Sequence, residues 1–182
     1  ILGGLMPCNG IPDEILTTHP DRLRAAFVES SNPVHSLADT KRWREAFEAL
    51  EFSVVIDVAM TETAECADYV LPTSTQYEKA EATFFTFEFP ENFFHLRPPV
   101  VDPIDGVLPE PEIHRRLCHE LGVYTDDDLA PLHAAATQGL DAYADAFLSV
   151  IAASPDLGRY LPVVLYETLG PTLPEGMESA AA

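Results

Sequence analysis

The sequence predicts an α/β protein with a doubly wound, mainly parallel sheet and flanking helices. Three short apolar segments, at residues 25–29, 54–57 and 69–71, each end in a polar or proline-containing turn and have the composition of buried strands. An amphipathic segment separates the first two, and a strand–helix–strand unit of this length joins parallel strands by a right-handed crossover. The nearly continuous hydrophobicity of the strands is typical of a sheet covered on both faces.

The helix between the first two strands is predicted from its start signal and its apolar face. Ser36, with Asp39 three residues later, is similar to a capping box. The apolar face that follows consists of Trp43, Ala46, Phe47 and Leu50. After the second strand, Thr61 can cap a short helix over residues 62–67, which leads into the third strand.

The second half of the chain predicts a hairpin, two helices and a terminal strand. Residues 83–97 are dense in Phe, and a core hairpin or lid is favoured there over an aromatic ligand cage. Apolar periodicity predicts a helix over 113–121, stopped by Gly122, and a longer one over 132–151. A strand is expected at 162–166, followed by a linker rich in Gly and Pro.

Composition indicates a soluble globular protein and argues against two classes of partner. The chain has 182 residues, of which 47% are hydrophobic, enough to bury a core. Ten basic and 30 acidic residues give a formal net charge of -20, which disfavours nucleic acid and anionic membrane surfaces as partners. The first residues resemble neither a signal peptide nor a native start but a chain in progress, and we expect a cytoplasmic location.

The three cysteines do not have the spacing of a metal cluster or a disulfide framework. Cys8, Cys66 and Cys118 lie far apart with no C-x-x-C motif, so we expect reduced structural thiols and no metal ligand set in this segment. His114 and Cys118 could share a helix face as ligands, but no further ligands cluster nearby and core packing is the better interpretation. The sequence also lacks the glycine-rich nucleotide motifs, the esterase elbow and the zinc-protease motif.

Candidate binding residues follow the strands, because ligands of open α/β sheets bind beyond the carboxyl ends of the strands. Ser31 and Asn32 follow the first strand, and the Pro after Asn32 restricts its backbone. A turn that serves only the backbone is the alternative. Asp57 ends the second strand, where a carboxylate can accept hydrogen bonds from a ribose or a guanine edge, or simply cap the turn.

Two charged sites further along the chain are weaker candidates. Lys79 is one of only ten basic residues and could offset the charge of a diphosphate, although a solvated surface lysine is the alternative. Glu78 and Glu81 have a spacing that suits a pair of catalytic carboxylates but also an ordinary charged helix face.

Taken in order, five short motifs resemble the molybdopterin oxidoreductase family, which includes dimethyl-sulfoxide reductase, periplasmic nitrate reductase and formate dehydrogenase. The resemblance extends from about Arg24 to Leu121, somewhat more than half of the chain. The motifs are Val28-Glu29-Ser30-Ser31-Asn32-Pro33, Val54-Val55-Ile56-Asp57, Thr61-Glu62-Thr63-Ala64, Ala67-Asp68-Tyr69-Val70-Leu71-Pro72 and Glu78-Lys79.

The resemblance implies a Rossmann-like region that holds the guanosine end of one of two molybdopterin guanine dinucleotides, whose dithiolenes ligate molybdenum or tungsten. It assigns to this cofactor the residues Ser31, Asn32, Ile56, Asp57, Thr61, Lys79 and Glu110. It also implies a parent enzyme that performs two-electron redox chemistry, with the catalytic metal ligand outside this chain. An iron–sulfur cluster upstream, the other domains of the same polypeptide and an electron-transfer subunit are the implied partners.

The chain departs from the family pattern at several positions. Ser30 stands where the family usually has Gly, so the turn either avoids a positive φ or is strained. Glu88-Phe89-Pro90-Glu91 and Pro111 are further departures, which indicate a divergent branch. We expect residues 1–125 to form the cofactor-binding region, 126–154 a helical extension, and 155–182 a strand and linker toward another domain.

Two other functions fit the same residues. The parent could resemble relatives that kept the scaffold and lost the metal, such as the large iron–sulfur subunit of respiratory complex I, in which case Asp57 and Lys79 are structural. The chain could instead be a stand-alone nucleotide-binding module without molybdopterin.

Overall fold

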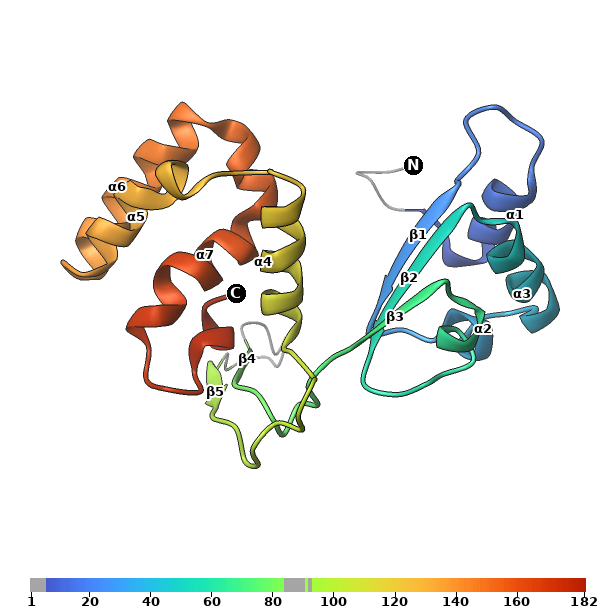
Figure 1. Ribbon diagram of the computed structural model, residues 1–182, viewed down its shortest axis with the longest axis horizontal. Coiled ribbons are helices and arrows are strands. Elements are labelled where there is room, and N and C mark those ends of the chain that lie inside the picture. Colours follow the sequence, from blue (N-terminus) through green and yellow to red (C-terminus); the bar gives the residue numbers. More distant parts are fainter. Residues whose placement is uncertain (1–5, 84–90, 92) are drawn as a thin grey trace. The chain divides into compact units, whose positions relative to one another are not determined.

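The computed structural model describes residues 6–83, 91 and 93–182, and the chain divides into two compact units (Figure 1). Unit 1 comprises Ile1–Thr73 and contains a parallel sheet; unit 2 comprises Ser74–Ala182 and is mainly helical. The boundaries at 125 and 154 that the sequence suggests for the whole protein stay predictions.

The sheet of unit 1 has three parallel strands in the order β1-β2-β3. Strand β1 is Ala25–Glu29, β2 is Phe52–Asp57 and β3 is Tyr69–Pro72. Val28 pairs with Val55 in the register. The predicted strands and their parallel direction are therefore confirmed, with β2 starting two residues earlier than expected.

The helices of unit 1 lie on one face of this sheet (Figure 1). They are η1 (Cys8–Gly10), α1 (Ile11–Leu16), α2 (Pro33–Ser36), α3 (Thr40–Ala49) and the single turn η2 (Ala64–Cys66). Val34, Trp43 and Phe47 form a buried cluster between them and the sheet, so the apolar face predicted for α3 is confirmed.

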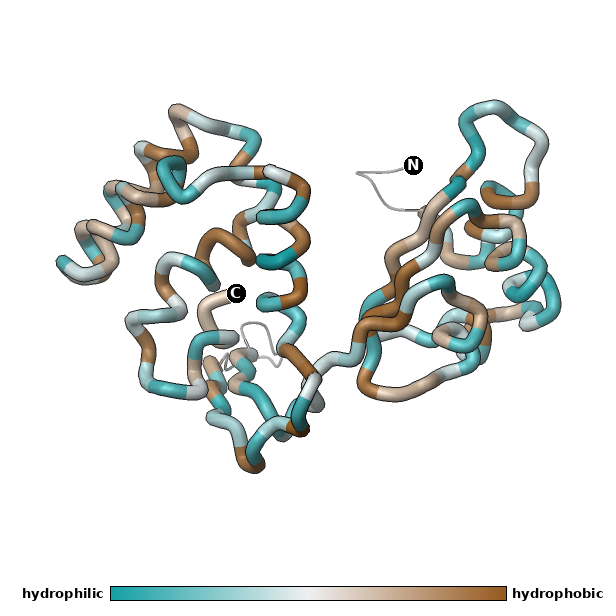
Figure 2. The backbone as a smooth tube through the Cα atoms, in the orientation of Figure 1, coloured by the Kyte–Doolittle hydropathy of each residue, from teal (hydrophilic) through white to brown (hydrophobic). Residues whose placement is uncertain are grey.

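An aromatic stripe occupies the opposite face of the strands. The side chains of Phe27, Phe52 and Tyr69 are 56%, 41% and 60% exposed. Their ring centroids lie 6.3 Å apart between Phe27 and Phe52 and 5.7 Å apart between Phe52 and Tyr69. Figure 2 shows the strands coloured mainly as hydrophobic. In the described part of unit 1 the helices thus cover one face of the sheet, whereas the sequence suggested two.

The N-cap of α3 differs from the prediction. Asp39, with a φ of 64°, accepts a hydrogen bond from the backbone N–H of Arg42 at 3.1 Å. Ser36 instead ends α2, and its hydroxyl donates to the carbonyl oxygen of Asn32 at 2.8 Å. The prediction of Ser36 as the start of this helix was wrong, because the acidic side chain next to the free N–H groups makes the cap.

Unit 2 begins with a short antiparallel pair, β4 (Glu81–Thr83) and β5 (His95–Arg97). These strands are the described ends of the predicted hairpin, whose residues Phe84, Phe85, Phe87 and Phe89 lie outside the described residues. The helices that follow are α4 (Glu110–Glu120), α5 (Asp126–Ala136), α6 (Leu140–Ala153), η3 (Pro155–Tyr160), α7 (Leu161–Leu169), η4 (Gly170–Thr172) and η5 (Glu178–Ala181).

Two sequence predictions in unit 2 were wrong. The long helix predicted over 132–151 is two helices, because Gly139 between α5 and α6 has a φ of 113°, which no helical residue adopts. The strand predicted at 162–166 lies within α7, which has Pro162 in its first turn. Val164 and Thr168, one helical turn apart, are fully buried there, so packing outweighs the β-propensity of the segment.

The helices of unit 2 share one hydrophobic core. It contains Cys118, Tyr124, Leu129, Leu132, Tyr143, Leu157, Val163 and Val164. The buried hydroxyls of Tyr143 and Thr168 lie 2.6 Å apart within hydrogen-bonding distance, which satisfies the polar end of a core aromatic residue. Among the residues that the structure describes, none of the helices has the length and apolar character needed to cross a membrane.

Candidate functional site

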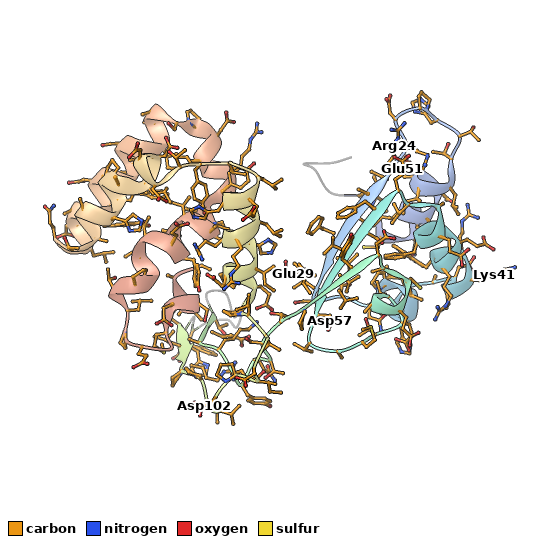
Figure 3. All side chains as sticks on the ribbon, viewed as in Figure 1. Arg24, Glu29, Lys41, Glu51, Asp57 and Asp102 are labelled. Carbon is orange, nitrogen blue, oxygen red and sulfur yellow. The ribbon has the colours of Figure 1, made fainter. Side chains whose placement is uncertain are left out.

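The carboxyl edge of the sheet in unit 1 gathers the turns that follow β1 and β2. Figure 3 shows Glu29 and Asp57 at this edge, with Arg24 and Glu51 at the opposite end of the strands. The parallel register places Glu29 beside Ile56, the residue before Asp57. Because parallel strands present their carboxyl ends on the same side, the two turns lie next to each other.

Asn32 ties these two turns together. Its Oδ1 accepts hydrogen bonds from the hydroxyl of Thr63 at 2.7 Å and from the Thr63 N–H at 3.3 Å. Its Nδ2 donates to Oε2 of Glu62 at 2.6 Å, and this bond is the main reason that the pKa of Glu62 is lowered. The side-chain amide of Asn32 is therefore committed to positioning the turns. Sequence reasoning named the motif but missed Glu62 and Thr63 as its partners, since the contact spans about thirty residues.

The turn between β1 and Asn32 adopts a strained backbone. Ser30 has a φ of 50°, in the left-handed region that favours glycine. Its N–H donates to the carbonyl oxygen of Ile56 at 3.1 Å, which extends the pairing of β1 and β2 by one residue. Of the two alternatives raised by a serine here, the structure has the strained one. Ser31 follows and is exposed to solvent.

Asp57 both caps its own turn and offers a second carboxylate oxygen. Its Oδ1 accepts from the N–H of Val58 at 2.7 Å and of Ala59 at 3.3 Å. Among the described residues, Oδ2 of Asp57 makes no hydrogen bond, and the side chain is half-buried at the sheet edge. A carboxylate held this way is preorganised to accept hydrogen bonds from hydroxyl or N–H donors of a ligand.

Ile56 and Thr61 have structural roles at the carboxyl edge of the sheet. Ile56 is fully buried, so only its backbone is available to the edge. The hydroxyl oxygen of Thr61 accepts from the N–H of Ala64 at 3.3 Å. The side chain of Thr61 therefore accepts a backbone hydrogen bond as predicted, but the helix predicted over 62–67 is the single turn η2, whose N-cap residue is Thr63.

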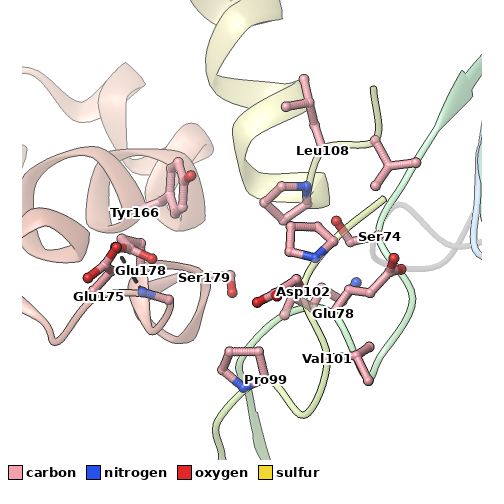
Figure 4. Close-up of a pocket in the computed structure, with 15 residues that line it drawn as sticks. Ser74, Glu78, Pro99, Val101, Asp102, Leu108, Tyr166, Glu175, Glu178 and Ser179 are labelled. Atoms are coloured by element: carbon pink, nitrogen blue, oxygen red, sulfur yellow. Dashed lines mark hydrogen bonds between the residues drawn. The ribbon is translucent and has the colours of Figure 1, made fainter. Parts of the chain in front are cut away.

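The two remaining candidates meet in unit 2. Lys79 and Glu110, the first residue of α4, form an ion pair, with their side chains only 13% and 14% exposed. Lys79 is thus neither a solvated surface lysine nor an isolated cation. It lines a pocket of about 560 Å³, which Figure 4 shows between the loop that carries Pro99, Asp102 and Leu108 and the segment from Glu175 to Ser179.

The neighbouring carboxylates are held by the loops of unit 2. Glu78 accepts from the N–H of Thr75 at 2.7 Å and from the N–H of Ile104 at 2.9 Å, and these bonds lower its pKa. Glu81 accepts from the guanidinium of Arg97 at 2.6 Å. The two carboxylates therefore have separate structural partners, and neither is on a helix face. Cys118 is part of the core, as expected.

The candidate residues thus form two groups. Unit 1 contributes the carboxyl edge of the sheet, and unit 2 contributes the buried ion pair. The edge group consists of Ser31, Asn32, Ile56, Asp57 and Thr61.

Comparison with known proteins gives a consistent result. The sequence resembles a probable oxidoreductase, YyaE, of Bacillus subtilis (39% identical over 69 residues, 38% of this chain and 10% of the relative). It resembles the alpha subunit of an F420-dependent formate dehydrogenase of Methanocaldococcus jannaschii (31% over 119 residues, 65% and 17%). It also resembles formate dehydrogenase H of Escherichia coli (40% over 62 residues, 34% and 8%).

The chain spans less than a fifth of the length of these curated relatives. The family model described as molybdopterin oxidoreductase matches residues 4–106, which is more than half of the chain. This match includes the strands of unit 1, the turns at their carboxyl edge and Lys79. The chain therefore belongs to the molybdopterin oxidoreductase family.

Proposed function

We propose that the carboxyl edge of the sheet in unit 1 binds the guanosine end of a molybdopterin guanine dinucleotide in an oxidoreductase of the formate dehydrogenase and dimethyl-sulfoxide reductase type. The observation that carries the proposal is the open oxygen of Asp57 beside two turns locked by Asn32. The bound molybdenum or tungsten would supply the two-electron redox chemistry. The residues of this chain would hold the nucleotide end.

The donor set fits such a nucleotide. A guanine edge and a ribose both present N–H or O–H donors, which a carboxylate oxygen accepts with about 1.5–3 kcal/mol per charged hydrogen bond. Ser31 adds an exposed hydroxyl on the adjacent turn. Because Ile56 is enclosed, its part in the site is to fix the position of the strand end.

Lys79 and Glu110 are the second part of this proposal. A lysine is a suitable contact for a diphosphate, and among the described residues Lys79 is the only basic one that lines the pocket of about 560 Å³. The remaining domains of the parent polypeptide would complete the cofactor site, and an iron–sulfur cluster with an electron-transfer subunit would carry the electrons.

The test is the substitution Asp57→Asn in the full-length parent enzyme. The amide keeps the oxygen that caps the turn but replaces Oδ2 with a donor. We expect the content of guanine nucleotide and of molybdenum or tungsten per polypeptide, measured after denaturation, to fall at least about tenfold. Asp21→Asn, at an exposed loop position, is the matched control and should retain full loading.

Two outcomes would contradict the proposal. Full cofactor loading in Asp57→Asn would remove the assigned role of this carboxylate. A wild-type parent that contains neither molybdenum nor tungsten would favour the metal-free scaffold, in which the same residues serve only the fold.

A further inference from the structure

A cluster of three metal-ligand side chains lies in the helical part of unit 2. Among the residues that the structure describes, His119, Asp126 and Glu167 each place a ligand atom within 4.8 Å of the others. They come from three different elements: His119 from α4, Asp126 from the start of α5 and Glu167 from α7. The cluster thus joins two consecutive helices, α4 and α5, to α7, which lies much later in the sequence.

The first two ligands are already oriented. Nε2 of His119 and Oε1 of Glu167 lie 2.8 Å apart, and the two side chains are 31% and 13% exposed. The hydroxyl of Tyr124 donates to the other oxygen of Glu167, Oε2, at 2.8 Å. The ring of Tyr124 also meets that of His119 edge-on, with centroids 5.2 Å apart. Such outer contacts fix the direction of ligating groups in metal sites.

The third ligand is free to adjust. Asp126 is exposed, and the capping box at this end of α5 is made by Thr125 and Asp128, so Asp126 is not needed as a cap. Ligand atoms bound at about 2.0–2.2 Å to one zinc ion lie about 3–4 Å from each other. Rotation of the Asp126 side chain can close the remaining separation.

We propose that His119, Asp126 and Glu167 bind a divalent transition-metal cation of the Zn²⁺ class, with water completing its coordination. One imidazole and two carboxylates are typical ligands of such ions, whereas Mg²⁺ and Ca²⁺ prefer oxygen alone. The site uses no thiolate, so the cysteine spacing does not argue against it. The bound cation fastens the start of α5 to α4 and α7.

Calorimetric titration of the untagged chain with Zn²⁺, in a large excess of Mg²⁺, tests the proposal. Every sample carries Cys8→Ser, because an exposed thiol can itself bind zinc. We call the sample whose only substitution is Cys8→Ser the parent sample, and we expect it to bind one Zn²⁺ per chain. Asp126→Asn and Tyr124→Phe should each weaken binding at least about tenfold. His133→Ala, which removes an exposed histidine of α5, is the matched control and should bind like the parent sample.

Thermal unfolding provides the second measurement. Zn²⁺ should raise the melting temperature of the parent sample and of His133→Ala but not of Asp126→Asn, which alters only an exposed residue and keeps the fold. The absence of Zn²⁺ binding in the parent sample would overturn the proposal and leave His119 and Glu167 as an ion pair. Equal binding by Asp126→Asn would overturn it as well.

Discussion

Asn32 and Thr63 are joined by two hydrogen bonds to a single oxygen, one from the hydroxyl and one from the backbone N–H of Thr63. Thr63 is fully buried, and its hydroxyl oxygen accepts in turn from the N–H of Val34 at 3.1 Å. The end of β1 is therefore joined to the loop after β2 by a chain of polar contacts that are partly or fully buried.

Removing this link should destabilise unit 1. Asn32→Ala leaves two donors of Thr63 and an oxygen of Glu62 without partners, and we expect the free energy of unfolding to fall by about 2 kcal/mol. Urea denaturation monitored by circular dichroism measures the change. Asn9→Ala, at an exposed position, should change stability by less than about 0.5 kcal/mol. Equal stability of the two variants would contradict a structural role for the amide.

The strained backbone of Ser30 leads us to expect a gain in stability on substitution, in contrast to the loss expected at Asn32. A glycine adopts a φ of 50° without the contact between Cβ and carbonyl oxygen that disfavours other residues. Ser30→Gly should therefore stabilise the chain by about 0.5–1 kcal/mol, after allowance for the greater freedom of glycine in the unfolded state. Ser31→Gly, one residue later, gains no such relief and should be neutral or slightly destabilising. Chemical denaturation of both variants compares them, and a loss of stability in Ser30→Gly would count against strain.

Glu112 on α4 should contribute to stability in a pH-dependent way. It accepts hydrogen bonds from Arg115 at 2.7 and 2.9 Å and from Arg116 at 2.8 Å, which lower its pKa from 4.5 to about 2. A lowered folded-state pKa means that the stabilisation is full above pH 4.5 and is lost as the pH falls toward 2.

The variant Glu112→Gln isolates this effect. We expect it to be about 1–2 kcal/mol less stable than wild type near neutral pH. The difference should shrink as the pH is lowered from 4.5 toward 2. Glu120→Gln, at an exposed position of the same helix, should match wild type throughout. Unfolding curves at several pH values provide the measurement, and a difference that does not depend on pH would rule out this origin.

Local patterns predicted the sheet because its strands are determined by local hydrophobicity. The limits of β1 agree with the sequence to the residue, and Gly122, with a φ of 62°, ends the helix where expected. The break at Gly139 and the helical state of 162–166 were missed because each depends on tertiary packing or on one backbone angle rather than on a repeating pattern.

The sequence named the candidate site residues but not the hydrogen bonds and ion pairs between them. The strand-end residues could be found because ligands of parallel sheets bind there. The use of the Asn32 amide by Glu62 and Thr63, and the approach of His119 to Glu167, could not be found, because residues about 30 and 48 positions apart leave no periodic signal.

The pairing of Lys79 with Glu110 changes how this lysine can respond to an anion. The charge of Lys79 is already compensated by Glu110. A diphosphate that binds Lys79 would therefore replace the Glu110 carboxylate as its counter-ion, instead of neutralising an unpaired cation. The affinity for phosphate then depends on the difference between two ion pairs, and the displaced carboxylate must be accommodated elsewhere. A ligand with two negative charges close together would offset the loss of the Glu110 carboxylate better than a ligand with a single charge.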